Sequence, residues 1–401
     1  MAIKNTKPKV LVAMSGGVDS SVAALLLKKQ GFEVIGVFMH FWAEGGAKSE
    51  AGNKCCSLAS FNDARRVANK LGIPLYTVNF DRPFKKLVVD PFLAGYKKGE
   101  TPNPCVECNR HIKFELLLKK ADELGADFIA TGHYAKTSTR GGKIILRRPK
   151  DKDKDQTYFL YTLDQKKLKR ILFPLADLIK PEVRALAKKA GLAVAGKPES
   201  QEICFIPGKS HNDFLKRHLK LKPGPIKLLA SCPGANHPAF QAPLLFKEGI
   251  QTKEEKRGSF LIPSLPRRGQ GVVLGEHQGL PLYTIGQRKG VEIGGIGPFY
   301  VAGRDYQTNT LYVVPDNDNK LLYKKEMVVR EADWISGKPK LPLKAKAVIR
   351  YRHLPVDCVI MSNGKTRLKI KFTKPQRAVT PGQSVVFYKN REVLGGGIIE
   401  A

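Results

Sequence analysis

The chain has 401 residues, of which 42% are hydrophobic, so it can build two or three globular domains rather than one. It carries 69 Lys and Arg against 36 Asp and Glu, a formal net charge of +33, which favours a polyanionic partner such as nucleic acid over a merely solvated surface. Seven Cys without a secretory leader, and no run of about 18 apolar residues, exclude a secreted disulfide framework and a membrane protein, so we expect a cytoplasmic protein.

Strand and helix patterns alternate along the first half of the chain. The expected strands cover residues 10–14, 34–39, 75–80 and 128–131, and the expected helices cover 19–30, 58–71 and 112–124. Strands separated by helices predict an α/β domain with a doubly wound parallel sheet. Ligands of such sheets bind at the carboxyl ends of the strands.

The pattern changes in the second half of the chain. One more helix is expected over 211–219, and from residue 344 onward short alternating runs between turns predict a small antiparallel barrel. Residues 227–268 are rich in Pro, Gly, Ser and Lys with weak periodicity, so we interpret them as an insertion or long flexible loop. We therefore expect three domains, at 1–207, 208–298 and 299–401.

The strongest motif is the hexapeptide Ser15-Gly16-Gly17-Val18-Asp19-Ser20, between the first expected strand and helix. Its glycines let backbone N–H groups turn toward a ligand, and the helix N-terminus adds partial positive charge. The hydroxyls of Ser15, Ser20 and Ser21 can donate to phosphate oxygens. No Lys follows the glycines, so this is not the phosphate loop of kinases and GTPases. The alternative is an ordinary glycine-rich turn that caps a helix.

Two further segments carry cysteines. In residues 101–109, two prolines predict a rigid, non-helical approach, and Cys108 precedes the helix expected at 112–124, whose N-terminus would lower the pKa of the thiol. Cys-x-x-Cys is also half of a zinc site, but no second pair follows at finger spacing. Cys204 lies between apolar residues and reads as a core residue unless it works with Cys108, since two thiols can perform sulfur transfer.

The hexapeptide resembles the pyrophosphatase loop of ATP enzymes that cleave between the α and β phosphates. With the cysteine segments and further motifs, the chain resembles the bacterial tRNA-specific 2-thiouridylase family over nearly its whole length, apart from residues 227–268. The further motifs lie at residues 151–160, 275–279, 284–290, 350–352 and 380–384. The resemblance implies an ATP-pyrophosphatase domain related to the adenine nucleotide alpha hydrolases, a central tRNA-binding domain and a C-terminal barrel.

The resemblance also implies a reaction: ATP, with Mg²⁺, adenylylates the C2 oxygen of the wobble uridine of tRNA. Cys204 would carry a persulfide from a sulfur-relay protein or cysteine desulfurase, and Cys108, the other catalytic thiol, would form a disulfide with it. The implied nucleotide contacts are Ala13, Met14, Ser15, Gly16, Gly17, Val18, Asp19, Ser20, Met39 and Gly132. The implied contacts with tRNA or its target base are Asn103, Pro104, Cys105, His133, Lys154, Asp155, Gln156, Arg350, Tyr351 and Gln383.

Several alternatives stay open. Many family members have Asp at the position of Cys105, so either proton handling moves elsewhere or that carboxylate is not needed. Cys105, Cys108 and Cys204 together could also hold an iron–sulfur cluster with one open iron. Met39 could be a core residue, and His133 a strand-end histidine satisfied by backbone. Residues 350–351 could be an ordinary exposed pair. The competing functions are an amide-forming synthetase with the same loop and an RNA-binding module with a vestigial nucleotide loop.

Overall fold

The part of the chain that the structure describes forms two compact units. The computed structural model describes residues 7–44, 57–199, 203–206, 210–229, 272–291, 293, 298–317, 319–364 and 366–400. One unit comprises Met1–His218, Glu326–Lys374 and Pro381–Ala401, and the other Leu219–Lys325 and Pro375–Thr380. None of the helices in the described ranges is long and apolar enough to cross a membrane. Most of the expected insertion, from residue 230 to 268, lies outside the described residues.

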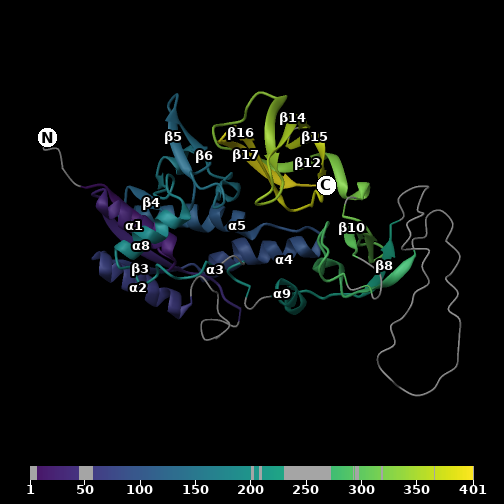
Figure 1. Ribbon diagram of the computed structural model, residues 1–401, viewed down its shortest axis with the longest axis horizontal. Helices are drawn as coiled ribbons and strands as arrows, with labels where there is room; N and C mark the ends of the chain where they lie inside the picture. Colours follow the sequence, from purple (N-terminus) through teal and green to yellow (C-terminus); the bar gives the residue numbers. More distant parts are fainter. Residues whose placement is uncertain are drawn as a thin grey trace, which may run out of the picture. The chain divides into compact units, whose positions relative to one another are not determined.

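A five-stranded sheet forms the centre of the first part of the chain (Figure 1). Its order is β3-β2-β1-β4-β7, and every pairing is parallel. The strands are β1 (Lys9–Ala13), β2 (Glu33–His40), β3 (Leu75–Asn79), β4 (Phe128–Ala130) and β7 (Ile171–Leu172). Since the chain moves outward from β1 to β3 and returns to the other side at β4, the topological switch point lies between β1 and β4. The carboxyl ends of these two strands are where a ligand is expected.

The helices that connect these strands begin and end where the sequence indicates. The helix α2 (Leu58–Leu71) has the bounds expected from its periodicity, because Ser57 accepts a hydrogen bond from the Ser60 N–H and Gly72 ends the helix at φ 58°. The helix α1 (Val18–Lys29) packs against α8 (Lys180–Lys189). The prediction of an α/β domain with a parallel sheet is confirmed.

One helix differs from its prediction. The helix expected at residues 112–124 begins at Pro104, with Asn103 as its N-cap residue. Proline is well suited to the first position of a helix, because its fixed φ is helical and no N–H is needed there. Pro104 therefore starts the helix, and the expectation of a non-helical approach through this residue was wrong. The segments are α5 (Pro104–Glu107), the π-helix η2 (Cys108–Leu116) and α6 (Leu117–Glu123).

A second helical run, which the sequence patterns did not reveal, packs against these segments. It consists of α3 (Asp81–Phe84), the π-helix η1 (Lys85–Val89) and α4 (Asp90–Lys97). The helix α5 contacts η1, and η2 contacts both α3 and η1. We call residues 81–97 the support helices, because both cysteine segments are packed against them, as described below.

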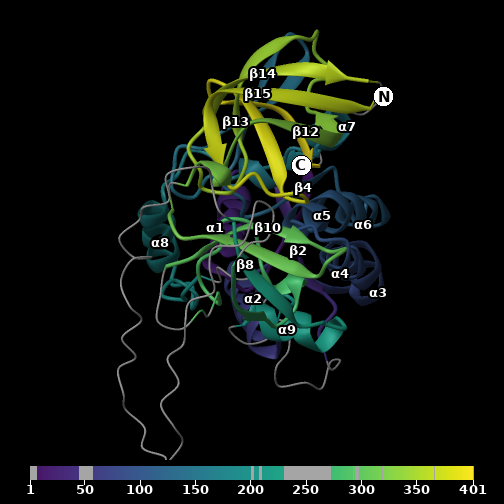
Figure 2. The same ribbon diagram turned by 90° about the vertical axis from the view of Figure 1, so that its right-hand side faces the viewer.

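The C-terminal strands form the predicted barrel (Figure 2). Six antiparallel strands follow the order β12-β15-β14-β13-β16-β17, and pairing of β12 with β17 closes the barrel. They are β12 (Tyr323–Trp334), β13 (Leu343–Val348), β14 (Val356–Asn363), β15 (Arg367–Arg377), β16 (Ser384–Lys389) and β17 (Glu392–Ile399). The hairpin of β5 (Lys136–Arg140) and β6 (Lys143–Arg147) extends this sheet through the pairing of β6 with β17.

The second unit contains a four-stranded sheet of order β10-β11-β8-β9. Its strands are β8 (Gly224–Leu228), β9 (Val273–His277), β10 (Tyr300–Asp305) and β11 (Thr310–Val314). The remaining helical elements are η3 (Thr157–Phe159), α7 (Gln165–Leu168), α9 (His211–His218), η5 (Leu280–Leu282) and η6 (Lys320–Leu322). The three domains expected at 1–207, 208–298 and 299–401 remain a prediction. The two compact units each combine separate stretches of the chain, so they do not test these boundaries.

Candidate functional site

The loop after β1 leaves the N-terminus of α1 open to an anion. Gly17 is the N-cap residue and has no side chain to cap the first N–H groups, which are therefore available to a ligand. Ser15 is exposed, and its N–H donates to Ser20 Oγ at 3.2 Å, so this hydrogen bond ties the loop to the first turn of α1. Ser21 is fully buried and donates to the Gly17 carbonyl at 2.8 Å, so its hydroxyl supports the helix rather than a phosphate. The arrangement is suited to an anion such as a phosphate group.

Gly16 is required by both conformation and space. Its φ is +69°, and a Cβ there would lie 2.1 Å from the Ser60 carbonyl oxygen. We expect Gly16→Ala to weaken ATP binding at least tenfold, because the loop must move away from α2. Gly31→Ala is the matched control, since Gly31 also has positive φ (+90°) but its Cβ would meet no atom within 4 Å. Backbone strain alone costs about 1 kcal/mol in both variants.

The two glycine variants are compared by thermal unfolding and by nucleotide titration. Both are expected to unfold at a lower temperature than the wild type, and only Gly16→Ala is expected to lose nucleotide affinity. Equal affinities in the two variants would show that the contact with Ser60 does not shape the loop.

Asp19 lies at the centre of a chain of charges that the sequence did not reveal. Lys180 donates to both carboxylate oxygens of Asp19, at 2.7 and 2.8 Å, and Tyr134 Oη donates to Asp19 at 3.1 Å. Lys180 is also 2.8 Å from Glu199, which forms a second ion pair with Lys154 at 2.7 Å. The Lys180 side chain is only 9% exposed, so this cation is held in the interior by two carboxylates. A lysine thus reaches the loop from α8 rather than from the motif itself.

A second lysine reaches the loop from the same distant region of the sequence. Lys197 donates to the Gly16 carbonyl at 3.0 Å and to Asp63 at 2.6 Å. The sequence signal for both lysines was weak: each precedes a proline, and neither falls within a phosphate-loop motif. The loop therefore has two fixed cations nearby, a suitable environment for phosphates.

The carboxyl end of β4 closes on this loop. A Cβ on Gly132 would lie 2.6 Å from the Ser20 backbone nitrogen, so only glycine allows the strand end to approach α1 so closely. His133 follows and is 9% exposed, with Nδ1 2.8 Å from Thr131 Oγ1. Burial, followed by the charge of Lys113, holds the pKa of His133 well below its usual value, so the ring is neutral. Met39, near the end of β2, is also buried. The expected contacts of Gly132, His133 and Met39 with ligands remain predictions.

The cysteines of the first segment occupy different environments. Cys105 is exposed in the first turn of α5, whereas Cys108 is buried, one turn into the continuous helix. The helix therefore starts before Cys105, and the N-terminal position expected for Cys108 belongs to Cys105. The positive end of the helix still lies within one turn of Cys108.

Cys204 lies in a half-buried turn that Phe205 anchors. The Phe205 ring packs edge-on against Phe84 at 5.8 Å and Phe92 at 5.4 Å, centroid to centroid. Both rings belong to the support helices, which also pack against α5 and η2. Tertiary packing thus brings two cysteine segments that are almost 100 residues apart in sequence onto one helical support.

The segment that leads to Cys105 is hydrogen-bonded to residues next to the barrel strand β16. Gln383 Nε2 donates to the Thr101 carbonyl at 2.7 Å, and the Thr101 N–H donates to the Pro381 carbonyl at 2.8 Å. A Cβ on Gly382 would lie 2.7 Å from the Thr101 nitrogen, so this contact is close. Gln383, expected to touch tRNA, is therefore placed to position the segment that leads to the cysteines.

The other barrel residues expected to bind tRNA lie beside the same segment. The Tyr351 ring packs on Phe159, with centroids 4.6 Å apart, and Tyr158 is 6.1 Å away. The Asn103 side chain hydrogen-bonds to Tyr158, whose hydroxyl donates to the Ser384 carbonyl at 2.8 Å. Burial raises the pKa of Tyr158, and the nearby charge of Arg350 acts in the opposite direction without outweighing it. The structure therefore brings together Asn103, Arg350, Tyr351 and Gln383.

The segment 154–156 joins this region to the loop after β1. Gln156 accepts from the Tyr134 N–H at 2.9 Å, and the hydroxyl at the other end of the same tyrosine donates to Asp19. Asp155 accepts from Thr157 Oγ1 at 2.6 Å, and burial raises the pKa of Asp155 despite that bond. Both side chains are thus bonded within the protein, and their expected contacts with tRNA remain predictions.

We expect Gln383→Ala to lower the rate of turnover up to tenfold without changing the KM for ATP. The reason is that it removes one neutral hydrogen bond, worth about 1 kcal/mol, from the approach to the cysteines and leaves the loop after β1 untouched. Gln307→Ala serves as the control, because it makes the same substitution at an exposed glutamine. A change in the KM for ATP with an unaltered kcat would contradict a positioning role; steady-state kinetics distinguishes these outcomes.

The described residues do not assemble a metal site. Among them, no three His, Cys, Asp or Glu side chains are grouped so that they hold a metal ion. Cys105, Cys108 and Cys204 are therefore not arranged as cluster ligands in this structure, and a cluster would require them to move.

Comparison with known families covers most of the chain. A family described as "tRNA methyl transferase HUP domain" matches residues 8–208, "tRNA methyl transferase PRC-barrel domain" matches 254–315, and "Aminomethyltransferase beta-barrel domain" matches 324–399. These assignments agree with the parallel sheet at the start of the chain and the closed barrel at its end.

Curated relatives match over the full length. The tRNA-specific 2-thiouridylase MnmA of Geobacter metallireducens is 43% identical over 99% of this chain and 98% of that protein. Those of Geotalea uraniireducens and Clostridium perfringens are 45% and 43% identical, over 99% of this chain and 96% and 99% of theirs. Among solved structures, a 4-thiouridine synthetase–RNA complex with bound ATP is 20% identical over 52% of this chain and 49% of that chain, with a TM-score of 0.34.

Proposed function

Since the chain belongs to the tRNA-specific 2-thiouridylase family, we propose that it uses ATP to activate the C2 oxygen of the wobble uridine of tRNA and replaces it with sulfur. The observation that carries the proposal is that the loop after β1, both cysteine segments and the barrel residues beside them belong to one compact unit. The reaction takes place in the cytoplasm, where its tRNA substrate is found.

In the first half-reaction, the residues around Asp19 hold ATP. The open N-terminus of α1 and the Ser15 hydroxyl receive phosphate oxygens, and Lys180 and Lys197 offset the charge of the departing pyrophosphate. Both Asp19 oxygens are engaged by Lys180, which supports a role in ordering the loop. Mg²⁺, when bound with ATP, would neutralise phosphate charge, and binding at Asp19 would require Lys180 to withdraw.

In the second half-reaction, the two thiols replace AMP by sulfur. The terminal sulfur of a Cys204 persulfide attacks C2 of the adenylylated uridine, and AMP leaves with the original oxygen. The base is then joined to Cys204 through a disulfide. The Cys108 thiolate attacks the Cys204 sulfur, which forms the Cys108–Cys204 disulfide and releases the 2-thiouridine. A reductant restores the thiols, and a sulfur-relay protein or cysteine desulfurase supplies the next persulfide.

The barrel side supports recognition of the substrate. A uridine in an anticodon loop is exposed at little energetic expense, and aromatic rings stack on exposed bases. Tyr351 is half-exposed, and Arg350 beside it is suited to a phosphate. Asn103 and Cys105 lie on the segment that these side chains adjoin, so the base would be held next to the cysteines.

The test is to incubate the protein with ATP, unmodified tRNA and a persulfide donor, and to measure 2-thiouridine in the tRNA by mass spectrometry. We expect 2-thiouridine together with one AMP per modified base. An amide-forming synthetase would need glutamine or ammonia and would leave the tRNA unchanged. An RNA-binding module would bind tRNA without consuming ATP. Either result would overturn the proposal.

A further inference from the structure

A basic hollow lies between two hairpins of the extended barrel sheet, apart from the site described above. It has a volume of about 290 Å³ and is lined by Ser138, Thr139, Arg140, Ile145, Arg147, Lys389, Asn390, Arg391 and Glu392. The residues come from the β5–β6 hairpin and from the turn between β16 and β17, which the pairing of Glu392 with Arg147 joins. We call Arg140, Arg147, Lys389 and Arg391 the basic strip.

The charges of the basic strip are only partly compensated. Glu392, the one acidic residue among the nine, pairs with Arg140 at 2.7 Å. Arg391 donates to the carbonyls of Arg148 and Pro149, which fixes its guanidinium but does not neutralise it. Arg147 and Lys389 are exposed and form no ion pair with any residue that the structure describes. The strip therefore presents one cation that is held in place, Arg391, and two exposed cations, Arg147 and Lys389, in the same hollow as Ser138 and Thr139.

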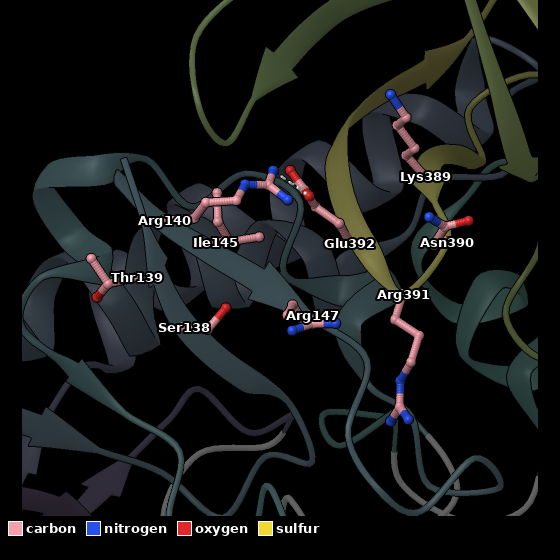
Figure 3. A pocket seen from close by; sticks show the side chains of 9 residues that line it. All are labelled: Ser138, Thr139, Arg140, Ile145, Arg147, Lys389, Asn390, Arg391 and Glu392. Carbon is pink, nitrogen blue, oxygen red and sulfur yellow. Dashed lines mark hydrogen bonds and ion pairs between the residues drawn. The ribbon is translucent and has the colours of Figure 1, made fainter. Parts of the chain in front are cut away.

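The directions of these side chains favour an extended anion over a small one. In Figure 3, Lys389 and Arg391 leave the β16–β17 turn in opposite directions, and Arg147 lies between Arg391 and the Arg140–Glu392 pair. A single phosphate would need donors that converge on one point, whereas a nucleic-acid backbone presents phosphates in succession. The strip thus matches a stretch of backbone.

The strip lies at the end of β16 that is remote from Gln383, the residue that bonds to the segment leading to the cysteines. Gln383, which bonds to Thr101, precedes the first residue of β16, and Lys389 ends that strand. Six residues of strand span about 20 Å. Arg391 is bonded to the segment that leads from Arg148 to Asp155, so the strip is continuous with a segment expected to contact tRNA.

We propose that the basic strip binds backbone phosphates of tRNA outside the anticodon stem–loop and so anchors the body of the substrate. The inference rests on the proposed function for the identity of the RNA. Such phosphate contacts would add to the affinity for tRNA whatever its nucleotide sequence, and they would not depend on the reaction at the cysteines.

The test compares three proteins: the wild type, Arg147→Ala/Lys389→Ala, and the control Lys29→Ala/Lys70→Ala. The control removes the same charge from exposed residues in the last turns of α1 and α2, at the opposite ends of these helices from the site. Binding of full-length tRNA and of an isolated anticodon stem–loop is measured by fluorescence anisotropy over a range of salt concentrations.

The strip variant is expected to bind full-length tRNA roughly tenfold more weakly than the control and to reduce the slope of log affinity against log salt by about 1.5, for two lost contacts. Its affinity for the stem–loop should equal that of the control. Equal affinities for full-length tRNA, or an equal loss with the stem–loop, would overturn the proposal. Inorganic phosphate that competes at millimolar concentration with the wild type but not with the strip variant would indicate a small-anion site and would overturn it too. Because the readout is binding, a failure of thiolation in the wild type would count against the proposed function and leave this test intact.

Discussion

Replacing Cys204 by serine is expected to abolish formation of 2-thiouridine, with a loss of at least a thousandfold, while tRNA binding and the release of pyrophosphate on adenylylation persist. A serine hydroxyl cannot carry a persulfide, so the sulfur has no route to the activated base. Cys108→Ser is expected to be equally inactive, but to trap the base on Cys204, because the thiol that releases it is missing. Mass spectrometry of the tRNA and of the protein distinguishes the two variants.

Two further cysteines serve as controls. Cys358→Ala should leave activity unchanged, since burial, followed by the nearby charge of Asp357, raises the pKa of this barrel thiol to about 12 and keeps it protonated. Cys105→Ser should retain appreciable activity in the two-thiol mechanism. Complete loss of activity in Cys105→Ser would favour the three-cysteine cluster instead, and near wild-type thiolation by Cys204→Ser would refute the persulfide assignment.

Asp19→Ala is expected to lower pyrophosphate release from ATP by roughly 30- to 160-fold. The substitution leaves the nearly buried Lys180 with Glu199 alone and removes the acceptor of the Tyr134 hydroxyl. Charge-assisted hydrogen bonds of this kind are worth about 2 to 3 kcal/mol, which gives that range of rates. Asp90→Ala is the control, because Asp90 also pairs with a lysine, at 2.7 Å, but on an exposed surface. Unchanged pyrophosphate release in Asp19→Ala would remove the nucleotide site from this loop.

The same network gives a dependence on pH. Burial acts to raise the pKa of Glu199, but its hydrogen bonds to Lys154 and Lys180 outweigh burial and lower this pKa to about 2. The pKa of Glu199 is lower in the folded protein than the usual 4.5. The ionised Glu199 with its two lysine partners therefore stabilises the fold fully above pH 4.5, and this contribution is lost as the pH falls toward 2. Glu199→Gln should therefore unfold with less dependence on pH in this acid range than the wild type, measured by circular dichroism.

Local features of the sequence identified the motifs and most of the elements of the first sheet. The bounds of α2 followed from its periodicity, Ser57 and Gly72, and the hexapeptide at residues 15–20 forms the turn after β1 and the first turn of α1. The barrel followed from alternating runs. These features could be predicted from the sequence because each depends on residues only a few positions apart. The family resemblance also rests on such short motifs, taken together with their order along the chain.

The surroundings of the motifs were decided by tertiary structure. Lys180 reaches Asp19 across 161 residues, and Gln383 reaches Thr101 across 282. No periodicity predicts such pairs, because they depend on how α8 packs on α1 and how the barrel docks on the cysteine segment. α5 starts at Pro104 although the Asn103 side chain does not cap it; that side chain hydrogen-bonds to Tyr158 instead, a partner that only tertiary packing supplies. The sequence by itself determined which chemical groups the protein has and in which local turns they lie; only packing decided which charges neutralise one another, and which cations remain exposed to a polyanion.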